Sequence, residues 1–242
     1  MRKNKKKLEI FMTAMILAIS FYIGRLGAGI VASGKMQYES GMIVEDKKIT
    51  VVIDAGHGGI DDGKVGVNKA MEKEVNLSIA QVLESMLENE GVKVIMTRKD
   101  NNGLYDEGES NKKQQDLKRR CTLINESGAL LAVSIHQNSY TDSSVKGPQV
   151  FFYKSSKEGG RLASILQTSL NESLEIERPR ECKANDSYYL LRKTTPPTVI
   201  AECGFLSNAE EAKKLVTEEY QERVAKAICD GIMEYILLVK DE

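Results

Sequence analysis

The stretch Val51-Val52-Ile53-Asp54-Ala55-Gly56-His57-Gly58-Gly59 decides the fold that the sequence predicts. Its first four residues suit a buried strand, because a β-branched apolar run bounded by glycine is typical of a parallel sheet. Open α/β sheets bind ligands just beyond the carboxyl ends of such strands. The glycines allow a tight turn and leave room beside the imidazole. His57 is therefore either a site residue at the edge of a sheet or a structural histidine in a loop, and a lone histidine more often has the second role.

Strands and amphipathic helices alternate along the rest of the chain. Apolar residues recur at helical spacing from Val75 to Leu87, and a strand follows over Val92–Met96, which completes a β-α-β unit. Further strands are expected at 129–135, 148–153, 188–192 (short) and 198–201, and further helices at 117–124, 160–174, after a capping box formed by Ser207 and Glu210, and at 218–237. This alternation predicts an α/β fold over residues 49–242: a single domain with a mostly parallel twisted sheet of about six strands and helices on both faces.

The N-terminus has the pattern of an export segment. Residues 1–34 hold six basic residues and one acidic residue, and the run from Ile10 to Gly24 is apolar and uncharged. This pattern predicts a signal peptide or an N-terminal membrane anchor over 1–34, followed by a polar tether over 35–48. The alternative is a cytoplasmic amphipathic helix. The protein is expected to act outside the cytoplasm, at the membrane if the segment is not cleaved.

Charge and cysteine content narrow the classes of partner and site. Outside residues 1–34 the chain has 28 basic and 34 acidic residues, and this acidic balance argues against a nucleic-acid partner. The four cysteines are widely spaced, with no C-x-x-C pair, so cysteine ligation of a metal is not expected. Two disulfides are permitted in an exported protein. Because Cys121, Cys203 and Cys229 lie in apolar segments, buried free thiols are expected instead.

Polar side chains follow three of the predicted strands or lie close to their ends. The two histidines of the chain, His57 and His136, each come after a predicted strand, and Glu202 ends another. Two imidazoles and a carboxylate suffice for an open catalytic zinc site, which then needs a second carboxylate as its acid or base. Glu72 and Glu74 also qualify, although the dipole of the helix that they begin favours carboxylates there in any case. The residues alone do not choose the ligand among the three glutamates.

Several motifs together resemble one known family. They are Asp54 to Gly59, Glu72 to Glu74, Ser134 to Asn138 and Ala201 to Asn208, with 117–125 and 189–192 in support. In this order they resemble the zinc-dependent N-acetylmuramoyl-L-alanine amidases (the Amidase_3 group) over about residues 50–237. The resemblance implies that His57, Glu72 and His136 are the zinc ligands and that Glu202 is the catalytic carboxylate.

Some positions depart from the family pattern or have open roles. The usual proline, aspartate and alanine of its motifs are Ala55, Glu74 and Gln137 here, and none of these changes removes a ligand. Asp54 is expected either to orient a ligand imidazole or to make a structural contact in the turn. Asn138 and Arg192 are candidates for holding glycan or peptide, with structural roles as the alternative.

The resemblance also implies a reaction, the Zn²⁺-dependent hydrolysis of the amide between N-acetylmuramic acid and L-alanine in peptidoglycan. With an export segment and one catalytic domain, the chain looks most like the CwlD-type amidases of spore-forming bacteria, which remove stem peptides so that muramic-δ-lactam forms in the spore cortex. A vegetative autolysin of the same fold is one alternative, and a non-catalytic peptidoglycan-binding module is another. An accessory protein could hold zinc in the site or open it.

Overall fold

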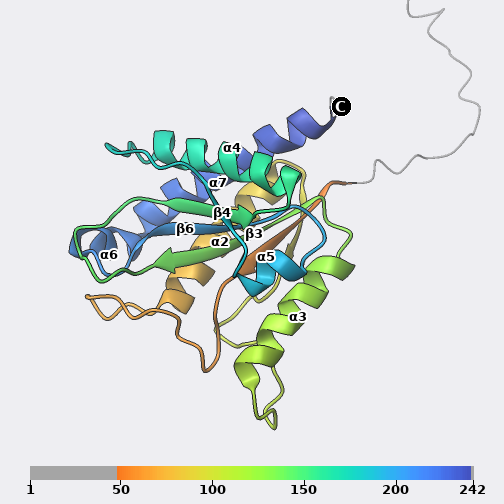
Figure 1. Cartoon of the computed structure of the whole chain (residues 1–242), viewed down its shortest axis with the longest axis horizontal. Coiled ribbons are helices and arrows are strands. Elements are labelled where there is room, and N and C mark those ends of the chain that lie inside the picture. Colours follow the sequence, from red (N-terminus) through yellow and green to blue (C-terminus); the bar gives the residue numbers. More distant parts are fainter. Residues whose placement is uncertain (1–47, 241–242) are drawn as a thin grey trace, which may run out of the picture. The chain divides into compact units, whose positions relative to one another are not determined.

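The computed structural model describes residues 48–240, which contain one six-stranded sheet (Figure 1). The strand order is β2-β1-β3-β6-β4-β5. The strands are β1 (Thr50–Ala55), β2 (Lys93–Met96), β3 (Leu131–Asn138), β4 (Gln149–Tyr153), β5 (Lys183–Asn185) and β6 (Thr198–Phe205). The structure confirms the expected single α/β domain with a six-stranded sheet.

The sheet is mostly parallel, as expected, with one antiparallel pair. Strands β2, β1, β3 and β6 run parallel, β4 is antiparallel to β6, and β5 is parallel to β4. Parallel neighbours need a crossover of a dozen or more residues, usually through a helix. The connection from β3 to β4 spans only 139–148 and contains no helix, so the chain turns back at the carboxyl edge and β4 runs the other way.

Helices cover both faces of the sheet, which confirms the layered arrangement (Figure 1). One face packs against α2 (Glu72–Asn89), α4 (Lys157–Ser173) and α7 (Glu218–Lys240), and the other against α3 (Lys112–Glu126) and α5 (Tyr189–Lys193). A short helix, α6 (Ala209–Leu215), follows β6. Successive strand residues alternate between faces, so Val51 and Ile53 join the first core and Val52 the second.

Two local expectations are wrong. The stretch 188–192 is not a strand, because Tyr189–Lys193 forms the helix α5. The strand at this edge of the sheet is instead β5, the polar segment Lys183–Asn185. Ser207 does not cap α6. The capping residue is Asn208, whose side chain accepts hydrogen bonds from the backbone N–H groups of Glu210 and Glu211.

Three strand and helix boundaries also differ from the expected ones. Strands β3 and β6 continue past their apolar runs to Asn138 and Phe205, so His136 and Glu202 lie inside strands rather than after them. Helix α3 begins at Lys112, because Asn111 caps it before its apolar residues start. The two strand extensions place His136 and Glu202 on strand backbone.

The cysteines are free, and Cys121, Cys203 and Cys229 are buried, as expected. The expected export segment (1–34) and nearly all of the tether (35–48) lie outside the described residues. Within residues 48–240, no helix combines the length and the apolar character that crossing a membrane requires.

Candidate active site

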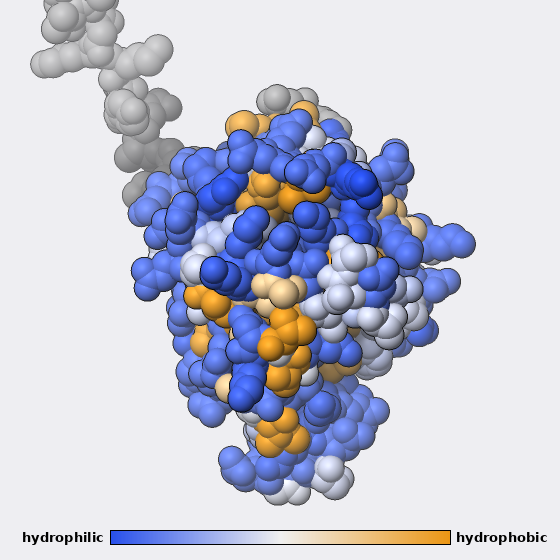
Figure 2. All heavy atoms as spheres, turned by 90° about the vertical axis from the view of Figure 1, so that its left-hand side faces the viewer, coloured by the Kyte–Doolittle hydropathy of each residue, from blue (hydrophilic) through white to orange (hydrophobic). Residues whose placement is uncertain are grey.

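The sheet brings three polar residues to one edge. Strands β1, β3 and β6 are parallel neighbours, so their carboxyl ends meet on the side of the molecule that faces the viewer in Figure 2. His136 of β3 and Glu202 of β6 are register partners. Their side chains therefore emerge on the same face of the sheet, about 4.8 Å apart at the backbone. His57 follows β1 by two residues and lies at the same edge.

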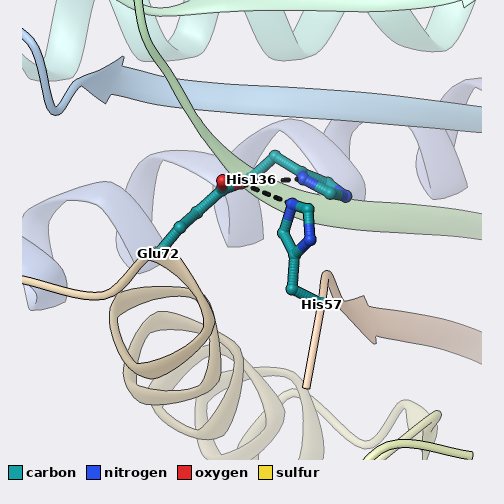
Figure 3. Close-up of side chains that lie close together, drawn as sticks. All are labelled: His57, Glu72 and His136. Atoms are coloured by element: carbon teal, nitrogen blue, oxygen red, sulfur yellow. Dashed lines mark hydrogen bonds and ion pairs between the residues drawn. The ribbon is translucent and has the colours of Figure 1, made fainter. Parts of the chain in front are cut away.

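His57, His136 and Glu72 converge on one point (Figure 3). His57 Nε2 lies 3.2 Å from Glu72 Oε1, and His136 Nδ1 lies 2.9 Å from the same oxygen. The two imidazole rings are 4.9 Å apart and nearly perpendicular. One potential ligand atom from each residue lies within 4.8 Å of the others, so this group could hold a metal ion.

Glu72 is the carboxylate that the fold brings to the histidines. It opens α2, is 2% exposed, and accepts hydrogen bonds from the backbone N–H groups of Lys64 (2.7 Å) and Gln137 (3.1 Å). Burial opposes its ionisation, but hydrogen bonds from His136 and His57 hold the pKa of Glu72 well below its usual range. Glu74, in the same helical turn, is exposed and lies outside the cluster.

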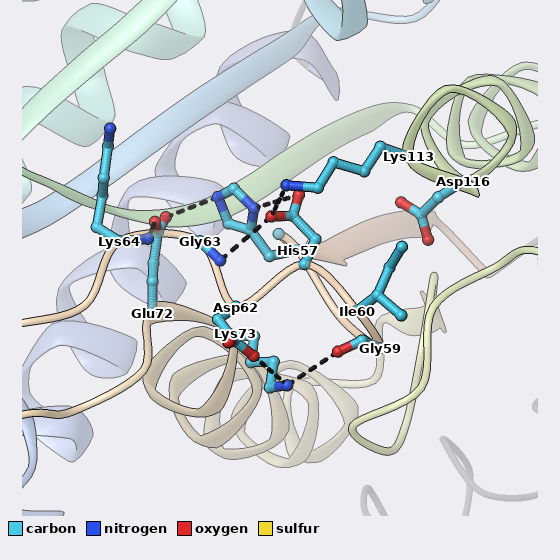
Figure 4. A network of polar contacts seen from close by, with 12 residues as sticks. His57, Gly59, Ile60, Asp62, Gly63, Lys64, Glu72, Lys73, Lys113 and Asp116 are labelled. Carbon is cyan, nitrogen blue, oxygen red and sulfur yellow. Dashed lines mark hydrogen bonds and ion pairs between the residues drawn. The ribbon is translucent and has the colours of Figure 1, made fainter. Parts of the chain in front are cut away.

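His57 has a strained backbone and a fixed ring. Its φ is 63°, a left-handed conformation that residues with a Cβ rarely adopt and that recurs at functional sites. Its Nδ1 lies 2.9 Å from Asp61 Oδ2, while Asp61 Oδ1 accepts from Lys113 of α3 at 2.7 Å. Figure 4 shows Lys113 reaching toward His57 from α3, with Glu72 on the other side of the ring.

Asp61 was not predicted from the sequence, although it lies four residues after His57 in the same loop. Because Nδ1–H of His57 donates to Asp61, the neutral ring keeps its lone pair on Nε2, the nitrogen that faces Glu72. Burial disfavours the charged ring, but Asp61 and Glu72 outweigh burial and raise the pKa of His57 to about 9. The pair of carboxylates thus makes the centre of the cluster favourable for positive charge.

Glu202 lies beside the cluster as a buried carboxylate. It is 8% exposed, and its Oε2 has no hydrogen-bond partner within the described part of the chain. Burial raises the pKa of Glu202 to about 7, against the lowering effect of His136. A buried carboxylate with a free oxygen and a pKa near neutrality can exchange protons with a neighbouring reactant.

Asp54 does not orient an imidazole, so its structural alternative is the correct one. Its carboxylate is 2% exposed and accepts from Thr97 (2.7 Å), Ser134 and Arg120 (2.7 Å). The carboxylate that contacts an imidazole is Asp61, which lies 2.9 Å from Nδ1 of His57. Asp54 contributes to the site indirectly, because it joins β1 to β3, to α3 and to the residue after β2, beneath the turn that carries His57.

Asn138 and Arg192 are not brought into the cluster. The side chain of Asn138 accepts from the backbone N–H of Ser139 (2.8 Å) at the end of β3. Arg192 is exposed on α5, which packs on the same side of the sheet as α3. Among the described residues, no hydrogen bond or ion pair joins either side chain to His57, Glu72 or His136.

Glycines make room for the cluster itself. A Cβ on Gly56 would lie 2.3 Å from His136 Nε2, and one on Gly63 would lie 2.5 Å from Glu72 Oε2. Real Cβ contacts are never that short, so the imidazole and the carboxylate occupy the space that a side chain would take. The sequence predicts room beside the His57 imidazole, whereas the space at Gly56 is filled by the ring of His136 and lets that ring approach β1.

Two imidazoles and a carboxylate around one point, beside a buried unpaired carboxylate, are typical of metal-dependent hydrolases. The chain belongs to the N-acetylmuramoyl-L-alanine amidase family (Amidase_3), whose family model matches residues 51–234. It is a peptidoglycan amidase. The family membership that the motifs predict is confirmed.

Known members of this family align with most of the chain. The germination-specific N-acetylmuramoyl-L-alanine amidase of Bacillus subtilis is 39% identical over 188 residues, which cover 76% of this chain and 78% of that protein. The structure of the CwlD amidase from Clostridioides difficile, in complex with the GerS lipoprotein, has a TM-score of 0.77 and 39% identity and covers 79% of this chain and 100% of that one. The B. subtilis amidase LytC is 32% identical over 189 residues, 77% of this chain but 35% of that protein.

We expect Gly56→Ala to lower amidase activity strongly in a folded protein, because the added methyl group would displace His136 from Glu72. Activity on purified peptidoglycan and the circular dichroism spectrum measure the two effects. Gly108→Ala is the matched control, since a Cβ there meets nothing within 4 Å. Wild-type activity of Gly56→Ala would show that the position of His136 does not matter.

Proposed function

We propose that the chain is a zinc-dependent amidase in which His57, Glu72 and His136 hold the metal and Glu202 is the catalytic carboxylate. The convergence of the three side chains within 4.8 Å carries the proposal. Two nitrogens and one carboxylate oxygen form the donor set of open catalytic zinc sites, which leave one position for water or substrate. Asp61 supports the fit, because a carboxylate on the far nitrogen of a ligand histidine is the usual outer partner at zinc.

Each residue then has one task in the reaction. Bound zinc would polarise the scissile carbonyl and make a water molecule a stronger acid. Glu202 takes a proton from the attacking water and delivers it to the leaving nitrogen of L-alanine, for which its buried position beside the cluster and its free Oε2 are suited. Glu72 remains ionised and buried, and Asp61 holds the His57 ring in the tautomer that presents Nε2.

We expect Asp61→Asn to weaken zinc binding about 10- to 100-fold, the usual effect of removing the outer partner of a ligand histidine. An asparagine can still reach His57, but it removes the charge that favours a cation in the cluster. Competition with a chromophoric chelator measures the affinity. Asp62→Asn is the control, because Asp62 pairs with Lys73 rather than with a histidine; equal affinity of the two variants would contradict the role of Asp61.

We further propose that the substrate is spore-cortex peptidoglycan, from which the enzyme removes stem peptides so that the freed muramic acid can close to muramic-δ-lactam. The support is the 39% identity to the germination-specific amidase of B. subtilis and to the CwlD amidase of C. difficile. Muropeptide analysis of spores from a deletion strain tests this. Loss of the lactam is the expected result, whereas unchanged lactam with altered vegetative wall would favour the autolysin alternative.

Export and a partner protein complete the proposal. Residues 1–34 act as a signal peptide or membrane anchor and place the enzyme on the outer side of a membrane. A lipoprotein partner is proposed because the CwlD amidase of C. difficile was solved in complex with the GerS lipoprotein. Zinc titration of the purified chain with and without cell extract tests this: tighter binding with extract is expected, and equal affinity would contradict a partner that helps to hold zinc.

A further inference from the structure

Two buried guanidinium groups lie beneath the turn that carries His57. Arg98 follows β2 and is 4% exposed, and Arg120 lies on α3 and is 2% exposed. Burying a guanidinium is costly unless its N–H groups find acceptors. The acceptors of these two groups show what the guanidinium groups hold in place.

Arg98 donates to backbone carbonyls only. Its Nε donates to Ala55 O (2.8 Å), its Nη2 to Gly56 O (3.0 Å) and to Lys73 O (2.7 Å), and its Nη1 to Asp100 O (2.7 Å). Lys73 belongs to the first turn of α2, next to Glu72. A single guanidinium therefore joins the turn before His57 to the helix end that presents Glu72.

Arg120 completes the set of carbonyl contacts. Its Nη1 donates to Ala55 O at 2.7 Å as well as to the Asp54 carboxylate, and its Nη2 donates to His57 O. Its Nε donates to Asp116 on its own helix (2.6 Å). Together the two arginines bind the carbonyl oxygens of three consecutive residues, 55, 56 and 57.

These contacts oppose the natural tendency of the turn to relax. A left-handed φ is unfavourable for a residue other than glycine and persists only where surrounding contacts hold it. His57 has this φ, and the carbonyls on both sides of its Cα are each bound by a guanidinium. The planar guanidinium of Arg98 binds four carbonyls through three separate nitrogens, whereas a lysine ammonium has three N–H donors on one nitrogen and cannot reach all four from there.

We propose that Arg98 and Arg120 are positioning residues for the metal site, which hold the strained turn at His57 and fix its distance from Glu72. Neither side chain touches the point where the three ligand residues converge. The inference rests on the proposed zinc site and adds two residues that act through His57 and Glu72. Removing either guanidinium should therefore lower metal affinity while the sheet and its cores remain folded.

The test is zinc affinity of the full chain in the variants Arg98→Lys and Arg120→Lys, measured by chelator competition. Each variant keeps the positive charge but loses the planar guanidinium with its five N–H donors. We expect about 10- to 100-fold weaker zinc binding, as for other outer partners of a metal site. Cobalt(II) in place of zinc gives a second readout, because its visible absorption reports the ligand geometry. We expect altered cobalt bands in both variants.

Leu170→Ala is the control for a general loss of stability. Leu170 is fully buried in the core beneath α4, and its truncation destabilises the protein without touching the turn. We expect wild-type zinc affinity and wild-type cobalt bands for this variant. The proposal is overturned if the lysine variants bind zinc as the wild type does, if Leu170→Ala weakens binding as much as they do, or if neither lysine variant folds. A wild-type chain that binds no zinc would instead refute the proposed function.

Discussion

The variant Glu202→Gln should bind zinc and lose amidase activity by a factor of about 10²–10⁴, the range that a general acid–base contributes. The glutamine has the same shape, so β6 and its register with His136 should persist. Its amide can neither accept a proton from water nor deliver one to the leaving nitrogen. Release of stem peptides from peptidoglycan and zinc content per chain are the two measurements.

The matched control is Glu74→Gln, an identical change at an exposed position in the first turn of α2. It should retain the wild-type rate. Wild-type cleavage by Glu202→Gln would remove Glu202 from the mechanism, and loss of zinc in this variant would show that Glu202 is a ligand rather than the catalytic group.

The dependence of kcat/KM on pH also tests the role of Glu202 as the catalytic base. Burial raises the pKa of Glu202 to about 7 in the metal-free protein, and a bound dication would lower it. A base works when it is ionised. As pH rises through the pKa that Glu202 has in the zinc-bound enzyme, kcat/KM should therefore increase, and it should level off above that pKa. The residual activity of Glu202→Gln should lack this rise; a wild-type profile that falls across the same range would contradict the assignment.

The variant Glu72→Gln should lose both zinc and activity. Glu72 is 2% exposed, and the one oxygen that faces His57 and His136 supplies the negative charge between them. A glutamine would be neutral and would leave the backbone N–H of Lys64 or the two rings facing an amide N–H₂. We expect zinc affinity to fall by more than about 100-fold, since a ligand contributes more than its outer partners do.

Zinc content after dialysis and peptide release measure this variant. A circular dichroism spectrum like that of the wild type separates metal loss from unfolding, because an unmade buried hydrogen bond costs only about 1–3 kcal/mol. The pattern across the two variants is decisive: Glu202→Gln keeps the metal and Glu72→Gln does not. Full zinc occupancy in Glu72→Gln would contradict its role as a ligand.

Much of this architecture follows from local sequence pattern. Hydrophobic periodicity and the positions of glycine are enough to predict the strand before His57, the β-α-β unit that this strand begins, and the alternation of strands and helices. The missed elements lack that signal: Lys183–Asn185 is a polar edge strand, and the first turns of α3 are polar. The short apolar run 188–192 fits either a strand or a helix, and packing against the core of the second face decides for α5.

The same limit applies to the site. The proposed ligand residues were predictable because their motifs resemble a known family, but the residues that contact and support them were not. Asp54 and Arg120 are 66 positions apart and meet only in the folded chain, and Arg98 binds carbonyls, which any residue provides. Only the fold distinguishes Glu72 from Glu74 as the carboxylate near the histidines. Helix α2 begins at Glu72 and buries it, whereas Glu74 is exposed.

We propose that this chain cleaves the amide to L-alanine with zinc held by His57, Glu72 and His136. The most direct test is the release of peptides by the purified chain, first stripped of metal and then titrated with zinc, with the new amino termini identified. Restoration of cleavage at one zinc per chain, with L-alanine as the new amino terminus, is the predicted result. Full activity of the metal-free chain, or products with any other new terminus, would contradict it.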